Sequence, residues 1–142
     1  MIQRNLSPKL KKVASWYPIV TVVGPRQSGK TTLCKQVFPD KPYVSLEALD
    51  LRRQALEDPR GFLAEHPDGA IIDEVQHAPD LLSYLQVEVD ARPEMGRFVL
   101  TGSQHLAISG KVSQSLAGRT AVLQLLMMTI HYAWLAAHKT AT

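Results

Sequence analysis

The chain has 142 residues, of which 45% are hydrophobic and 20% are charged, and its formal net charge at pH 7 is +3. This length and composition predict one globular domain, and the single cysteine, Cys34, excludes an internal disulfide framework and a multi-cysteine zinc site. Since the sequence has neither a signal-peptide pattern nor an apolar run long enough to span a bilayer, we expect a cytoplasmic protein without a membrane partner.

Residues 1–17 are predicted to form a helical lead-in. Ser7 and Pro8 are typical of an N-cap and a first helical position, and apolar residues then recur at helical spacing as far as Tyr17. The first twelve residues carry basic side chains and no acidic one. A basic arm of this kind can contact nucleic acid or an acidic partner, but a solvated helix face has the same composition and is the interpretation we favour.

Beyond residue 18, short apolar runs alternate with helical patterns. Helices are predicted over residues 30–38 and 46–56 and after Asp80, whose carboxylate can cap the helix that follows. Strands are predicted over residues 19–23, 43–45, 70–72, 97–101 and 121–126. This alternation is typical of an α/β sandwich with a mainly parallel five-stranded sheet.

A phosphate-binding motif lies between the first predicted strand and the helix that follows it. The segment fits the pattern G-x-x-x-x-G-K-[ST] and reads Gly24-Pro25-Arg26-Gln27-Ser28-Gly29-Lys30-Thr31. The glycines let successive amide N–H groups converge on anionic oxygens, and the helix directs its positive end at the same point. A random chain of this length matches the pattern only roughly once in two hundred. We predict that these residues bind the phosphates of a nucleotide.

Three side chains of this segment, and that of Thr32 directly after it, have more specific predicted roles. Lys30 can reach the β- and γ-phosphates and is a candidate catalytic cation, and the hydroxyl of Thr31 can ligate Mg²⁺. Thr32 is expected to assist near the α-phosphate. Arg26 can contact either the nucleotide or a neighbouring molecule, and the sequence does not decide between them.

An acidic pair follows the third predicted strand. A P-loop hydrolase needs a carboxylate at the end of a neighbouring buried strand to hold the magnesium shell, and Asp73 is placed there. Glu74 is predicted to polarise the attacking water as a general base. Both residues could instead simply end the strand, but the phosphate-binding motif upstream favours the catalytic interpretation.

Two further candidates keep alternative interpretations. Ser103, just beyond the fourth predicted strand, can sense the γ-phosphate or orient the water, and it can equally be a turn serine after glycine. Arg119 can supply a cation to the transition state, in cis or across a subunit contact, and it can equally be an exposed arginine paired with a carboxylate.

Taken together, these segments resemble the prokaryotic AAA-type ATPases in which an N-terminal ATPase core precedes a C-terminal domain of unknown function. The resemblance implies a P-loop NTPase three-layer sandwich with strand order 5-1-4-3-2, with Glu74 as the catalytic glutamate and Ser103 as a sensor-type residue. It also implies ATP rather than GTP, because no guanine-reading Asn-Lys-x-Asp segment is present. The matching segments are residues 24–33, 43–47, 58–59 with 62–63, 71–76, 100–103 and 115–119.

The resemblance divides the chain into the lead-in, an ATPase core over residues 18–126 and a divergent apolar tail over residues 127–142. Proteins of this group usually continue from the core with a proline-containing segment, an acidic residue and the C-terminal domain, which this tail does not match. We therefore expect a truncated or frame-shifted product, or a relative that consists of the core alone. The apolar tail also predicts self-association, which makes a homo-oligomer a candidate assembly.

The predicted function is that of a Mg²⁺-dependent core that binds ATP and hydrolyses it, slowly as a monomer. A nucleotide-dependent binding module with little turnover is the first alternative, and a nucleic-acid-associated ATPase that uses the basic N-terminal arm is the second. A small-molecule kinase is a third. It is disfavoured because Asp73 and Glu74 are adjacent and no arginine-rich lid is recognisable.

Overall fold

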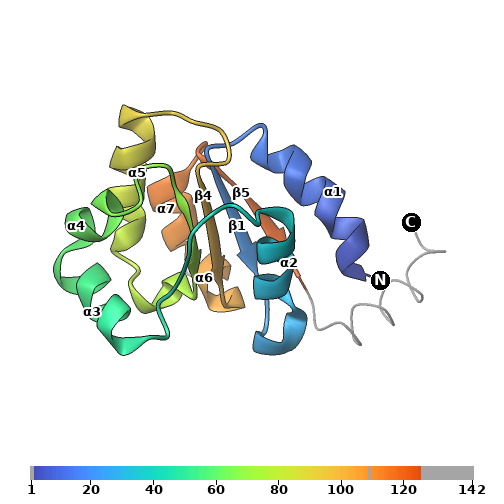
Figure 1. Cartoon of the computed structure of the whole chain (residues 1–142), viewed down its shortest axis with the longest axis horizontal. Helices are drawn as coiled ribbons and strands as arrows, with labels where there is room; N and C mark the ends of the chain where they lie inside the picture. The colour runs from blue at the N-terminus through green and yellow to red at the C-terminus, as the bar shows by residue number, and fades with distance from the viewer. Residues whose placement is uncertain (1, 109, 126–142) are drawn as a thin grey trace.

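The computed structural model describes residues 2–108 and 110–125 as a β-sheet covered by helices (Figure 1). The strands are β1 (Ile19–Val23), β2 (Tyr43–Ser45), β3 (Ala70–Asp73), β4 (Phe98–Gly102) and β5 (Thr120–Gln124). The α-helices are α1 (Ile2–Ala14), α2 (Lys30–Val37), α3 (Leu49–Glu57), α4 (Pro59–Ala64), α5 (Leu81–Ala91), α6 (Gln104–Ile108) and α7 (Lys111–Leu116). Two short 3-10 helices, η1 (Arg26–Ser28) and η2 (Val75–His77), follow β1 and β3.

The five strands form one sheet in the order β2-β3-β4-β1-β5, and all neighbouring strands run parallel. The predicted order 5-1-4-3-2 is the same order read from the opposite edge, so both the α/β class and the strand order are confirmed. Parallel neighbours require crossover connections, which the helices provide. The loops that follow the carboxyl ends of the strands therefore gather on one side of the sheet, where ligands bind in folds of this kind.

Helices cover both faces of the sheet and give the predicted three layers (Figure 1). Successive residues of β1 face opposite cores, as the two-residue period of a strand requires. Ile19 and Val23 pack with apolar residues of α3, α4, α5 and α7, whereas Val20 and Val22 pack with those of α1 and α2. β1, β3 and β4 are buried along their whole length, in agreement with their mainly apolar sequences.

The first helix differs from its prediction. α1 begins at Ile2, so the start predicted at Ser7 is wrong, and Pro8 lies inside the helix. A proline inside a helix removes its own N–H donor and crowds the carbonyl group four residues earlier, but packing of an apolar face can hold a helix together around such a defect. Leu10 and Val13 provide that face, because both are buried in the core shared with β1 and α2.

The helix after β2 also begins later than predicted. The N–H group of Leu46 donates to the carbonyl oxygen of Asp73 at 2.9 Å, and this contact continues the hydrogen bonding between β2 and β3. α3 consequently begins at Leu49 rather than at Leu46. Asp80 occupies the predicted N-cap position of α5, but its carboxylate does not cap the helix and instead lies 4.0 Å from the ammonium group of Lys111.

The two ends of the chain are described to different extents. No helix in the described part is long and apolar enough to cross a bilayer. β5 is an edge strand beside β1, and residue 126, the predicted end of the fifth strand, lies outside the described residues. The predicted apolar tail over residues 127–142 lies outside them as well.

Candidate functional site

The phosphate-binding segment forms a tight loop between the buried end of β1 and the start of α2. Gly29 has φ +84°, a left-handed conformation that glycine adopts without steric cost, and it precedes Lys30 at the first position of α2. A Cβ atom on Gly24 would lie 2.2 Å from the carbonyl oxygen of Leu125, so only glycine fits where the loop leaves the sheet. Inside the loop, the hydroxyl of Ser28 donates to the carbonyl of Pro25 at 2.7 Å.

Lys30 directs its ammonium group into the interior of the site. Its side chain is 3% exposed, and Nζ lies 3.3 Å from Oε2 of Glu74 and 3.4 Å from the carbonyl oxygen of Pro25. A buried charge requires a partner of opposite charge, and the Glu74 carboxylate, which is 10% exposed, supplies it. The ammonium group therefore lies between the phosphate-binding loop and the acidic end of β3.

Asp73 accepts three hydrogen bonds at the end of β3. The hydroxyl of Thr31 donates to Oδ1 at 2.9 Å, the hydroxyl of Thr101 donates to the same oxygen, and the hydroxyl of Tyr43 donates to Oδ2 at 2.6 Å. Burial, together with the hydrogen bond to Asp73, raises the pKa of the Tyr43 phenol, which therefore remains a donor at neutral pH. The three hydroxyl groups therefore hold the Asp73 carboxylate in one orientation.

Glu74 adopts an unusual backbone conformation. Its φ of 58° and ψ of 52° place it in the left-handed region, and among the described residues other than glycine it alone has a positive φ. Such a conformation costs on the order of 1–3 kcal/mol and is concentrated at functional sites. The backbone N–H of Glu74 donates to the Thr101 hydroxyl at 3.0 Å, while Oε1 accepts from Nε2 of Gln76 at 2.9 Å. The strained turn thus aims the carboxylate at Lys30.

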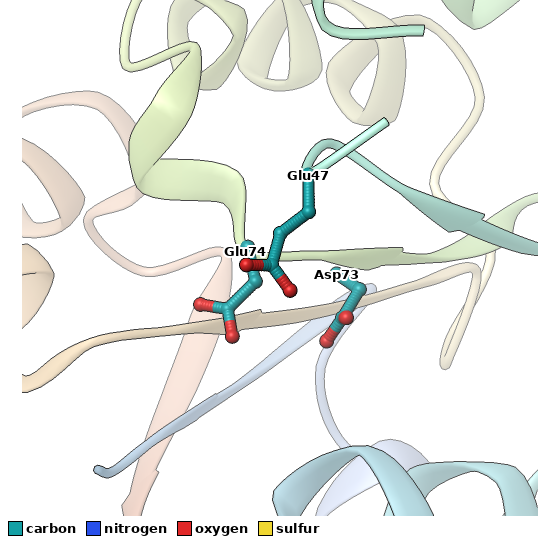
Figure 2. Close-up of side chains that lie close together, drawn as sticks. All are labelled: Glu47, Asp73 and Glu74. Atoms are coloured by element: carbon teal, nitrogen blue, oxygen red, sulfur yellow. The ribbon is translucent and has the colours of Figure 1, made fainter. Parts of the chain in front are cut away.

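A third carboxylate joins Asp73 and Glu74. Glu47 follows β2, and one carboxylate oxygen from each of the three residues lies within 4.8 Å of the others (Figure 2). Glu47 is also ion-paired with the guanidinium group of Arg26. Hydroxyl and carboxylate oxygens are the ligands that Mg²⁺ prefers, so the donor set around Thr31 and Asp73 fits this cation.

Lys30, Glu47 and Glu74 border a cleft of about 450 Å³, a volume in the usual range for small-molecule sites, whereas Thr31 and Asp73 are not among the residues that line it. The predicted site residues that line it are Gly24, Pro25, Arg26, Lys30, Glu74 and Ser103. Six residues without a predicted role line it as well: Glu47, Arg52, Gln76, His77, Gln104 and His105.

One known protein family matches most of the chain. A family described as "AAA domain" matches residues 17–132 of the sequence. The chain belongs to this AAA domain family. Two uncharacterised proteins, from Mycobacterium bovis and Mycobacterium tuberculosis, are each 37% identical to this AAA domain over 132 residues. The match covers 90% of the chain but only 29% of each relative, so the chain spans less than a third of their length.

Solved structures share the fold of this AAA domain at low sequence identity. A Walker-type ATPase of Pyrococcus abyssi superimposes with a TM-score of 0.57 at 17% identity, over 88% of this chain and 53% of that protein. The P-loop NTPase domain of a sigma-54 transport activator from E. coli superimposes with a TM-score of 0.55 at 11% identity, over 85% of this chain and 93% of that domain. The resemblance to AAA-type P-loop ATPase cores is therefore confirmed, and the family and fold imply nucleotide binding.

The remaining predicted residues of the AAA domain lie in different places. Thr32 is exposed in the first turn of α2, and Gln27 lies in η1. Ser103 borders the cleft, and its backbone N–H donates to Oε1 of Gln76 at 3.3 Å. Arg119 lies at the amino ends of the strands, directly before the first residue of β5, whereas the cleft lies at their carboxyl ends. Its guanidinium group makes two 2.7 Å contacts with Asp90. The structure thus brings Ser103 to the site but not Arg119.

The sequence analysis missed three residues that contact Asp73 or Glu74. Thr101 and Tyr43 both bond Asp73, and they belong to the strands on either side of β3. The predicted strand order placed these neighbours beside β3, so a search for polar residues on them would have found both. Gln76 contacts Glu74 from η2, and no sequence pattern indicates that contact.

Proposed function

We propose that this AAA domain binds ATP with Mg²⁺ in the cleft and hydrolyses it to ADP and phosphate. The observation that carries the proposal is the position of Lys30, whose buried ammonium group lies between the phosphate-binding loop and the Glu74 carboxylate. A cation in this position can bind the β- and γ-phosphates directly beside a base that can activate water.

Thr31 and Asp73 are the residues that would hold Mg²⁺. Their oxygens are already hydrogen-bonded to each other, while Tyr43 and Thr101 orient the carboxylate from either side. When bound, the cation neutralises part of the charge on the β- and γ-phosphate oxygens. The contacts from Tyr43 and Thr101 keep Asp73 in place, so little rearrangement is required on binding.

Glu74 is proposed to accept a proton from the attacking water. The water oxygen forms a bond to the γ-phosphorus, the bond from that phosphorus to the bridging oxygen breaks, and the electron pair leaves with ADP. The Glu74 carboxylate is paired with the Lys30 ammonium group. Phosphate oxygens compete for the same ammonium group, so nucleotide binding is expected to release the carboxylate for the water.

Asp73→Asn tests the proposal through its dependence on Mg²⁺. We expect the parent protein to release phosphate from ATP in the presence of Mg²⁺ and to stop when EDTA is added. Asp73→Asn should need a Mg²⁺ concentration at least about tenfold higher, because even changes to residues that only orient a metal's ligands typically cost about 10–100-fold in metal affinity. The exposed Asp50→Asn on α3 is the matched control. A parent protein that binds ATP without releasing phosphate would favour the binding module instead.

A further inference from the structure

Two interpretations of Arg119 were open from the sequence, and the structure shows the one paired with a carboxylate rather than one in the cleft. Stabilising the charge on a transferring phosphoryl group commonly requires an arginine. Arg119 lies at the amino ends of the strands, away from the cleft, with both of its 2.7 Å contacts directed to Asp90. Two other guanidinium groups line the cleft, those of Arg26 and Arg52. The two differ in whether their N–H donors are available to a phosphate.

Arg26 is already committed to another group. Its guanidinium group is ion-paired with Glu47, and its side chain is 74% exposed. A long side chain held at the surface loses conformational freedom when it is ordered and gains little from its charge in water. Arg26 is therefore the weaker candidate for a fixed phosphate contact.

Arg52 has the opposite properties. It lies in the first turn of α3, and its Nε–H donates to the carbonyl oxygen of Leu46 at 2.8 Å. Leu46 is fully buried and is itself hydrogen-bonded to the carbonyl of Asp73, so the anchor belongs to the rigid sheet. Within residues 2–108 and 110–125, the two terminal NH₂ groups of Arg52 have no hydrogen-bond or ion-pair partner.

The strand order indicates which phosphate Arg52 can reach. α3 follows β2 and Glu47, whose carboxylate lies beside those of Asp73 and Glu74 (Figure 2). A nucleotide held by the loop after β1 presents its γ-phosphate toward the base, so the γ end lies on the side of β3 and β2. Arg52 enters the cleft from that side, and its free NH₂ groups form the planar fork that binds phosphate oxygens in pairs.

We propose that Arg52 is a catalytic residue that contacts the γ-phosphoryl group of ATP from within the same chain. This inference rests on the proposed function, and it supplies the transition-state cation that Arg119 does not. Arg52 reads the γ-phosphate and makes no contact with ADP, so its removal weakens the binding of ATP but not that of ADP.

The test compares the binding of two nucleotides by four proteins. A β,γ-imido analogue of ATP and ADP itself, each with Mg²⁺, are titrated calorimetrically into the parent, Arg52→Ala, Arg52→Lys and Arg53→Ala. Arg53 is the neighbouring residue of α3 and is exposed, so its variant controls for the loss of one positive charge on this helix. Thermal unfolding of each protein checks the anchor to Leu46, and Arg52→Lys retains a cation and a donor for that carbonyl if Arg52→Ala is poorly folded.

Arg52→Ala is expected to lose about 10- to 100-fold in affinity for the ATP analogue, the amount that charge-assisted hydrogen bonds contribute. Its ADP affinity should stay within about twofold of the parent value, Arg53→Ala should match the parent for both nucleotides, and Arg52→Lys should lie between. Unchanged binding of both nucleotides by Arg52→Ala, or equal losses for both, would overturn the inference and leave the proposed function standing. A parent protein that binds neither nucleotide would overturn the proposed function first, and this inference with it.

Discussion

The prediction with the most structural detail behind it concerns Glu74→Gln. The substitution keeps the size of the side chain and an oxygen that can accept from Gln76, but it removes the charge that faces Lys30 at 3.3 Å. Both side chains are at most 10% exposed, so the Lys30 ammonium group loses its counter-charge in a poorly solvated place. Removing one partner of a buried ion pair costs about 3–5 kcal/mol, which is the expected loss in the free energy of unfolding without nucleotide.

Nucleotide should reverse that loss. Phosphate oxygens bring negative charge to Lys30, so we expect MgATP to stabilise Glu74→Gln by more than it stabilises the parent protein. Hydrolysis should nevertheless fall about 10²- to 10⁴-fold, the usual contribution of a positioned general base. The variant is therefore expected to bind ATP at least as tightly as the parent while hardly turning it over.

Two assays on the same preparations check this prediction. Denaturant unfolding with and without MgATP gives the stabilities, and single-turnover hydrolysis of radiolabelled ATP gives the rate. Glu57→Gln is the matched control, because Glu57 is exposed at the end of α3 and should change neither quantity. A rate within about tenfold of the parent would place water activation elsewhere, and an unchanged stability without nucleotide would refute the reasoning about Lys30.

The other predictions concern Cys34, Arg119 and the C-terminal segment. Burial raises the pKa of the Cys34 thiol from 9.0 to about 12. The contribution of this thiol to the free energy of unfolding should therefore be fully present below pH 9 and should decline between pH 9 and about 12. Unfolding curves across that range for the parent and Cys34→Ala would detect the difference. Arg119→Ala should leave single-turnover hydrolysis by dilute protein within about twofold of the parent, because Arg119 is paired with Asp90 away from the cleft. A rate that rises with protein concentration only in the parent would instead indicate a role across a subunit contact. Light scattering on the same dilution series tests the predicted self-association through the apolar sequence of residues 127–137, which a concentration-independent monomer would contradict.

Much of the fold was predictable because its signals are local. The β-branched run of β1, the glycine-containing loop and the apolar stripe of α5 each fix an element without reference to the rest of the chain. The start of α3 was not predictable in this way. Leu46 belongs to a segment whose sequence is typical of a helix, but its N–H group donates a hydrogen bond to the carbonyl of Asp73. That contact depends on how β2 pairs with β3.

The same distinction holds for the site. Lys30, Thr31 and Asp73 follow from a motif and from the end of a buried strand, and the structure joins Thr31 to Asp73 and Lys30 to Glu74, the neighbour of Asp73. The left-handed conformation of Glu74 has no sequence signal, because it arises where η2 turns away from β3. Arg119 was a candidate because it lies in one of the segments that match the family, and only the parallel register of β1 and β5 shows that it lies at the amino ends of the strands, away from the cleft.

The central claim is that Lys30 holds the phosphates of MgATP, and calorimetric titration of ATP in the presence of Mg²⁺ tests it most directly. The parent protein should bind one ATP per chain. Lys30→Ala should bind it at least about 10- to 100-fold more weakly, because a charge-assisted contact is lost. Lys11→Ala, which removes the same charge from the exposed face of α1, should match the parent. Equal affinities for the parent and Lys30→Ala, with the fold of both intact, would contradict the account.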